Sequence, residues 1–198
     1  MEGRSARRNK LPKAGGKSQP GAEPLARAFL IQAGHALQRQ HLPRITECVD
    51  RLSEEDVWWR PNSASNSVGN LVLHLAGNVH QWIVAGLGGE PDIRNRDLEF
   101  REQGPVPRRA LRALLEKEVR AAGRVILRLG PEELLQIYSI QNFHVTALQA
   151  VAHVVEHFAH HSGQIIYVTK LRLGEDLKFT RLPGGKTRRP RSRRLPAV

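Results

Sequence analysis

Four of the chain's nine histidines lie within one short segment, from His153 to His161. In an α-helix, His157 and His161 are one turn apart, and His153 and Gln164 lie within about 40° of His157 around the helix axis. Neutral imidazole is a common ligand of transition metals, and two histidines four residues apart can hold one ion from a single helix. The spacing therefore predicts a metal site on this helix.

Two other interpretations of these histidines stay open on spacing alone. An inward-facing histidine is more often a core residue with a satisfied hydrogen bond than a ligand, and Val154, Phe158 and Ile165 form an apolar face beside them. Several histidines in one stripe must share donors and acceptors in little space, which costs free energy unless an ion organises them. The alternatives are a structural polar stripe and an active-site histidine that works without metal.

A second polar stripe falls in residues 68–87. Asn70, Asn78 and Gln81 lie within about 40° of His74 around a helix, and apolar residues flank them. This pattern matches that of the later histidines, so His74 is the natural third ligand from a facing helix.

Apolar residues recur with helical spacing in four long segments. The pattern predicts helices over residues 24–52, 68–87, 107–129 and 145–173. Pro43 is expected to kink or split the first helix, because proline removes a backbone donor and clashes with the preceding turn. Gly163 in the last helix indicates a close approach of another backbone. The sequence shows no convincing period-2 strand pattern, so the predicted fold class is all-α, a four-helix bundle.

Residues 88–104, between the second and third helices, are predicted to form a long polar loop. Loops of this length are often lids or binding loops. Arg94 and Arg96 could bind an anionic group of a substrate. The segment also holds carboxylates that could pair with them: Asp92, Asp97 and Glu99. Local pairing is favoured.

The net charge of +12 resides in the two ends of the chain. Residues 1–20 carry six basic residues and one acidic residue, and residues 181–198 carry seven basic residues and no acidic one. We expect disordered basic tails over residues 1–21 and 181–198, with the bundle domain at residues 22–180. The tails are interpreted as solvated extensions, with weak, salt-sensitive binding to nucleic acid as the alternative.

Cys48 is the only cysteine, which excludes an internal disulfide and favours a reducing compartment. Its place in an apolar helical pattern indicates an inert core thiol. No apolar run reaches the roughly 20 residues that cross a bilayer. A cytoplasmic protein without a membrane partner is expected.

Two motifs resemble the DinB/YfiT-like family of metal-dependent four-helix-bundle proteins. The first is residues 66–78, Asn-Ser-Val-Gly-Asn-Leu-Val-Leu-His-Leu-Ala-Gly-Asn, and the second is the pattern His157-x-x-x-His161-x-Gly-Gln. The resemblance covers most of residues 25–175. It implies that His74, His157 and His161 hold one divalent metal and that the protein is a homodimer. Ser162 stands where the family usually has an arginine before Gly-Gln.

The resemblance further implies an enzyme that acts on a small-molecule substrate, either as a thiol S-transferase or as a hydrolase. Three protein ligands leave a coordination position open, as in catalytic metal sites. The three-histidine set suits Zn²⁺ first, and Ni²⁺, Fe²⁺ or Co²⁺ also fit. A low-molecular-weight thiol is the implied co-substrate. Gln164, Asn78 and His160 are the candidate catalytic residues.

Two rival functions remain from other classes. His153, Glu156 and His157 spell the inverted zinc-protease signature H-x-x-E-H, but such enzymes need a further acidic ligand well downstream on another element. Here only Glu175 and Asp176 follow, and Glu156 is expected at an edge or in solvent. The other rival is a non-enzymatic bundle that a metal stabilises and whose basic tails bind nucleic acid or anionic surfaces.

Overall fold

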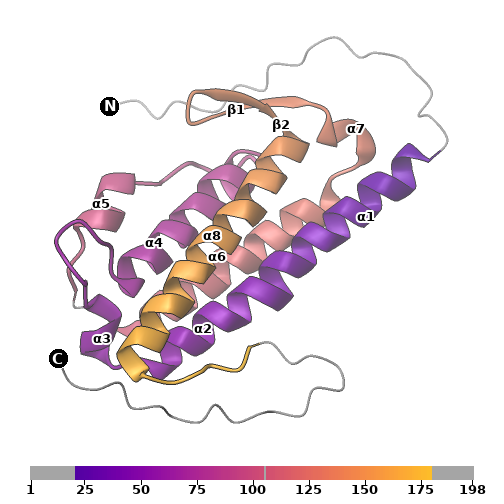
Figure 1. Ribbon diagram of the computed structural model, residues 1–198. Coiled ribbons are helices and arrows are strands. Elements are labelled where there is room, and N and C mark those ends of the chain that lie inside the picture. The colour runs from indigo at the N-terminus through magenta and orange to yellow at the C-terminus, as the bar shows by residue number, and fades with distance from the viewer. Residues whose placement is uncertain (1–20, 105, 180–198) are drawn as a thin grey trace, which may run out of the picture.

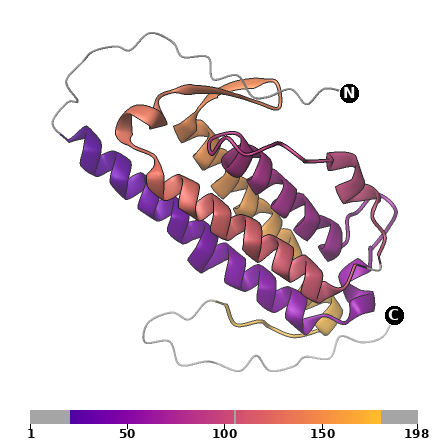
Figure 2. The ribbon, with the colours of Figure 1, turned by 180° about the vertical axis from the view of Figure 1, so that it is seen from behind.

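The computed structural model describes residues 21–104 and 106–179. The two predicted tails lie outside this range, apart from Gly21. In the described part, four helical stretches pack side by side as a bundle (Figure 1). The helix α8 lies in front of α6 in Figure 1 and behind it in Figure 2, so these two occupy opposite sides of the bundle. The predicted all-α four-helix bundle is confirmed.

The first helical stretch runs through the proline that was expected to disturb it. Helix α1 (Ala22–His35) continues as the π-helical segment η1 (Ala36–His41) and then as α2 (Leu42–Arg51), with Pro43 in the first turn of α2. The wider π-helical turns precede the residue that lacks a backbone donor. Pro43 therefore coincides with a change of hydrogen-bond pattern but does not split the helix.

The second stretch consists of α4 (Val68–Val79) and the π-helical segment η2 (His80–Ala85). Ser67 caps α4 by accepting a hydrogen bond from the backbone N–H of Asn70, whose side chain completes a capping box. The short helix α3 (Glu54–Trp58) lies in the connection from α2. The indole of Trp58 fills the space beside Gly69, where an added Cβ would lie 2.8 Å from the ring. This contact fixes the start of α4 against α3.

The polar segment before the third helix contains one short helix, α5 (Arg96–Arg101). Asn95 caps α5 by accepting a hydrogen bond from the backbone N–H of Leu98. The helix α5 packs against α4. The predicted loop is therefore partly ordered as a helix that lies on the second stretch of the bundle.

The third stretch, α6 (Arg108–Arg128), agrees with the helix predicted over residues 107–129 and buries one apolar face. After it come α7 (Pro131–Leu134) and an antiparallel hairpin of β1 (Ile137–Ile140) and β2 (Phe143–Thr146). The expectation of no strands was wrong. Each strand has only four residues, too few for alternation to show, and the hairpin depends on its turn. There Gln141 and Asn142 adopt positive φ of 51° and 68°.

The fourth stretch is α8 (Ala147–Leu173), the longest helix among the described residues. Thr146 caps it by accepting a hydrogen bond from the backbone N–H of Gln149. The predicted close approach at Gly163 is wrong, because this glycine is exposed and nothing lies within 4 Å of an added Cβ. Glycine lowers the helix propensity at this position, and no neighbouring group in the structure requires the absence of a side chain.

The core fills the space between the four stretches. Its largest fully buried side chains come from all of them: Leu30, Leu37, Ile45, Leu75, Leu111, Leu115, Ile126, Phe158 and Ile165. Cys48 is buried among them, and burial raises the pKa of its thiol to about 11, as expected of an inert core thiol. None of the helices within residues 21–104 and 106–179 has both the length and the apolar character needed to cross a bilayer.

Candidate metal centre

Three histidine rings from two helices converge inside the bundle. His74 comes from α4, whereas His157 and His161 lie one turn apart on α8. One ring nitrogen of each lies within 4.8 Å of those of the other two, and the Nε2 atoms of His74 and His157 are 2.9 Å apart. The three ring centroids are 4.5 to 5.1 Å apart. The structure thus brings together the three residues that the sequence singled out.

Burial and the neighbouring rings disfavour a positive charge on the two histidines of α8. His74 is only 5% exposed, and His157 and His161 are half-buried. Burial, together with the neighbouring rings of His161 and His74, lowers the pKa of His157 to about 3. Burial also lowers the pKa of His161. Neutral imidazoles have lone pairs to donate, so the donor set fits a divalent cation.

Glu99 contacts this cluster, and the sequence did not place it there. Its Oε2 lies 2.9 Å from Nδ1 of His74, and Arg94 binds both of its oxygens. Burial would raise the pKa of Glu99, but hydrogen bonds from Arg94 and His74 outweigh that effect and hold the pKa below its ordinary value. Glu99 is therefore a buried carboxylate next to a candidate metal ligand.

The expected local pairing of the two loop arginines is confirmed for Arg94, whose side chain is 2% exposed. Arg96 instead lies over the ring of Phe100, with its guanidinium carbon 5.0 Å from the ring centre. Each nitrogen of the Arg94 guanidinium contacts Glu99, Gln81 or His74, and the side chain is buried, so this residue is not presented to an anionic substrate.

The candidate catalytic residues occupy different surroundings. The Oε1 of Gln164 lies 2.7 Å from Nδ1 of His161, and its Nε2 lies 3.3 Å from Nε2 of His160. Both Gln164 and His160 are exposed, at the outer side of the cluster. Asn78 is buried one turn after His74, and its Oδ1 has no hydrogen-bond partner among the described residues. Each of the three is thus near a cluster histidine in space or along its helix.

The remaining residues of the last helix do not join the cluster. His153 stacks between Trp82, at 4.1 Å between ring centres, and His157, at 5.5 Å. The hydroxyl of Ser162 is buried, with no partner in the part of the chain that the structure describes. Glu156 is exposed, as expected. The arrangement therefore gives His153 an aromatic packing role beside the site.

The protease interpretation has no support in the structure. Its downstream acids are engaged elsewhere, since Glu175 pairs with Arg51 and Asp176 with Lys170. Neither acid belongs to the three-histidine group found among the described residues.

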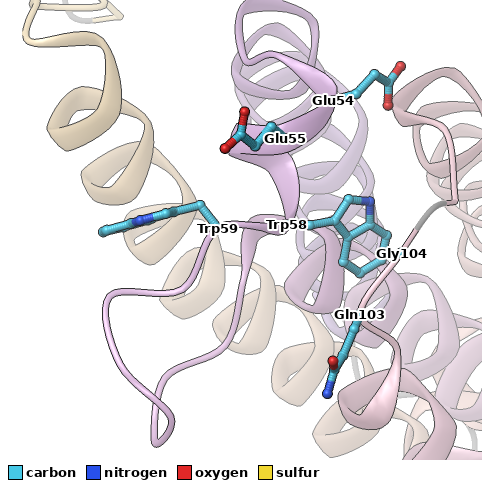
Figure 3. Close-up of a pocket in the computed structure, with 6 residues that line it drawn as sticks. All are labelled: Glu54, Glu55, Trp58, Trp59, Gln103 and Gly104. Carbon is cyan, nitrogen blue, oxygen red and sulfur yellow. The ribbon is translucent and has the colours of Figure 1, made fainter.

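Figure 3 shows an open hollow of about 560 Å³ whose lining contains no histidine. Its lining comes from the connection after α2 and from the end of the polar segment: Glu54, Glu55, Trp58, Trp59, Gln103 and Gly104. The indole N–H of Trp58 donates to the carbonyl of Val106, and Arg172 lies over the ring of Trp59. Both tryptophans are thus engaged in packing.

A protein-family model described as "Protein of unknown function (DUF1572)" matches residues 25–186. The chain belongs to this family. The family is DinB-like, and the resemblance found in the sequence motifs is thereby confirmed. No curated protein matches the sequence.

Solved structures of the same fold include two DinB-like proteins. One is from Bacillus cereus ATCC 10987, with 16% identity and a TM-score of 0.53, covering 68% of this chain and 86% of that one. The other is YjoA from Bacillus subtilis, with 21% identity and a TM-score of 0.54, covering 76% and 94%. A conserved protein from Enterococcus faecalis has 18% identity and a TM-score of 0.59, covering 77% and 97%. These similarities establish the DinB-like fold.

Proposed function

We propose that this DinB-like protein is a metal-dependent enzyme acting on a small molecule, with His74, His157 and His161 holding one divalent cation. The observation that supports the proposal most is the convergence of three imidazoles, two from one helix and one from another, at a half-buried place in the bundle. A structural zinc site usually has four protein ligands, whereas this group has three.

The cation we propose is Zn²⁺, with Ni²⁺, Fe²⁺ and Co²⁺ as metals that the same ligands accept. When bound, it would supply a Lewis acid with an open position, which activates a thiol or a water molecule. We favour transfer of a low-molecular-weight thiol over hydrolysis. Glu99, the carboxylate nearest the rings, is held by Arg94 and is not free to take a proton from water. A thiolate needs no such base once it is formed.

The chain's own residues would position the substrate. Gln164 and His160 lie on the exposed side of α8 next to His161, where a small molecule could reach them from solvent. Asn78 offers a buried acceptor without a partner among the described residues. We assign Gln164 and His160 to substrate contact and Asn78 to the inner wall of the site. A homodimer and a cytoplasmic location remain predictions.

Elemental analysis of purified protein tests the metal. Wild type is expected to contain about one equivalent of a divalent metal per chain, and His157→Ala almost none. The matched control is His160→Ala, which removes an exposed histidine three residues further along the same helix and should keep the metal. Equal metal content in His157→Ala and wild type would contradict the proposed site.

Thiol-conjugation assays on the metal-loaded protein test the reaction. Metal-loaded wild type is compared with the metal-free protein, using glutathione and a chlorinated aromatic electrophile as the probe pair, and His160→Ala should turn over more slowly because His160 is assigned to substrate contact. Metal-dependent conjugation supports the proposal. Metal binding without turnover on any thiol or ester probe would favour the non-enzymatic, metal-stabilised bundle instead.

A further inference from the structure

We infer that Glu99 is a positioning residue for His74: together with Arg94, it fixes the tautomer and orientation of the ring so that Nε2 offers its lone pair to the cation. The inference rests on the proposed function, because it assigns Glu99 a role at the proposed metal site. It is carried by the contacts around the buried side of the His74 ring.

The two nitrogens of His74 face different partners. Nδ1 lies 2.9 Å from Oε2 of Glu99, and Nε2 lies 2.9 Å from Nε2 of His157. An ionised carboxylate only accepts hydrogen bonds, so Nδ1 must carry the hydrogen. In a neutral ring, Nε2 then has no hydrogen and its lone pair points toward the cluster. This is the arrangement in which a carboxylate orients a metal-binding histidine.

Arg94 also approaches the ring, with its Nη2 3.1 Å from Nδ1 of His74. If Nδ1 had no hydrogen, it could accept a bond from Arg94, but its lone pair would then lie 2.9 Å from the lone pairs of Glu99. That repulsion disfavours the alternative tautomer. The shorter contact to Glu99 therefore decides where the hydrogen resides.

Arg94 holds the carboxylate in place. Its Nε donates to Oε1 of Glu99 at 2.7 Å and its Nη2 to Oε2 at 2.9 Å, a bidentate pair that fixes the plane of the carboxylate. Its Nη1 donates to Gln81, which belongs to the same helical stretch as His74. The pair therefore connects the polar segment to the helix that carries the ligand.

The backbone of α5 is fastened to the start of α4 as well. The amide of Asn70 donates to the carbonyls of Glu99 and Glu102 at 2.8 and 2.7 Å, and Arg60 donates to the carbonyls of Phe100 and Glu102. Asn70 is one helical turn before His74. The carboxylate thus reaches the ring from a backbone held at a fixed distance from it.

Imidazole ¹⁵N NMR on the metal-free protein tests the tautomer directly. In wild type, His74 is expected to carry hydrogen on Nδ1 and none on Nε2. The variant Glu99→Gln replaces an obligate acceptor with an amide that can donate or accept, so both tautomers should appear. A wild-type ring with its hydrogen on Nε2 would overturn the inference, and this result needs no variant to fold.

Zinc titration measures the consequence. Glu99→Gln is expected to bind Zn²⁺ about 10- to 100-fold more weakly than wild type, the usual effect of losing an orienting carboxylate. Glu118→Gln is the matched control, since Glu118 is also buried and lies 2.8 Å from a histidine Nδ1, that of His80. Its zinc affinity should stay within about twofold of wild type.

The outcomes separate the two claims. Glu99→Gln that binds zinc as tightly as wild type would overturn the positioning role while leaving the metal site intact. If wild type bound no metal but His74 had the expected tautomer, the proposed function would be overturned. The effect of Glu99 on the ring would still be supported. An equal loss of affinity in Glu118→Gln would overturn the positioning role by showing a general loss of packing.

Discussion

Two histidines of the second helical stretch each contact a buried glutamate from another helix, and only one of these pairs belongs to the candidate metal centre. Nδ1 of His74 lies 2.9 Å from Glu99, and Nδ1 of His80 lies 2.8 Å from Glu118. Both glutamates are less than a tenth exposed. The two pairs therefore share residue types, distance and a buried carboxylate, and they differ in what surrounds the histidine.

The difference lies at the second ring nitrogen. Nε2 of His74 faces another imidazole, whereas Nε2 of His80 lies 3.1 Å from the carbonyl of Pro91. His80 thus has an oxygen acceptor within hydrogen-bonding distance of each nitrogen, Glu118 at Nδ1 and the Pro91 carbonyl at Nε2. It connects the segment at Pro91 to α6, and it does not belong to the three-histidine group. The neighbour of the second nitrogen decides whether such a pair can serve a metal.

The largest expected effect comes from removing His74, the histidine proposed as a metal ligand. His74→Ala should abolish the rise in melting temperature that excess Zn²⁺ gives wild type, because a ligand that binds only the folded state stabilises it by mass action. His80→Ala should keep that zinc-induced rise. Differential scanning calorimetry with and without Zn²⁺ measures both. If His80→Ala lost the zinc-induced rise in melting temperature and His74→Ala kept it, His80 rather than His74 would be the metal ligand.

Removing His80, the histidine outside the metal centre, should lower the stability of the fold and leave metal affinity unchanged. His80→Ala leaves Glu118 buried without its imidazole partner, which costs about 3 kcal/mol in the free energy of unfolding, the low end of the usual cost of breaking a buried pair. The low end applies because Lys117 still lies 3.2 Å from Glu118. Urea unfolding with a chelator present measures the change. A cost below about 1 kcal/mol would show that the pair contributes little to the fold.

A smaller effect on zinc binding is expected at Gly77, where the lack of a side chain leaves room for the carboxylate of Glu99. An added Cβ at Gly77 would lie 2.1 Å from Oε1 of Glu99, so Gly77→Ala should displace the carboxylate and weaken zinc binding about tenfold. Gly123→Ala is the control, since its Cβ would meet Gln38 at 2.2 Å, an equal clash at another place. Zinc titration of both variants checks this, and equal affinities would count against the displacement.

The smallest effect should come from the exposed partner of the second pair. Lys117 is 76% exposed, so Lys117→Ala should change the free energy of unfolding by less than about 0.5 kcal/mol and leave zinc affinity unchanged. Urea unfolding measures the first and zinc titration the second. A loss as large as that of His80→Ala would mean that the lysine, rather than the imidazole, balances Glu118.

The helices were predictable because their apolar spacing is a local property. The predicted segments agree with α4 plus η2, α6 and α8 to within a few residues at their ends. The hairpin of β1 and β2 was missed, since strands of four residues depend on their pairing rather than on a pattern. The expected contact at Gly163 was wrong, and close approaches occur at other glycines, among them Gly69, Gly77 and Gly86. A glycine in a helix does not by itself show what packs against it.

Of the candidate site, the sequence indicated the histidines and missed the carboxylate. His157 and His161 share a helix face because they are four residues apart, and the motif around His74 supplied the third ring. Glu99 lies in a segment without a long periodic pattern, 25 residues from His74. Its place depends on the hydrogen bonds of Asn70, Arg60 and Arg94. Spacing made Glu99 a possible local partner of Arg94, but the contacts with Asn70 and Arg60 could not be deduced from it.

By itself, the sequence determined which residues share a helix face, because the geometry of an α-helix fixes side-chain directions over a few turns. It therefore specified the bundle, the histidine pair on α8 and the polar stripe on α4. Only the tertiary structure decided how α4 is rotated against α8, and which nitrogen of each buried histidine meets an acceptor. Those features depend on contacts between residues far apart in the chain, and such contacts cannot be deduced from the local geometry of a helix.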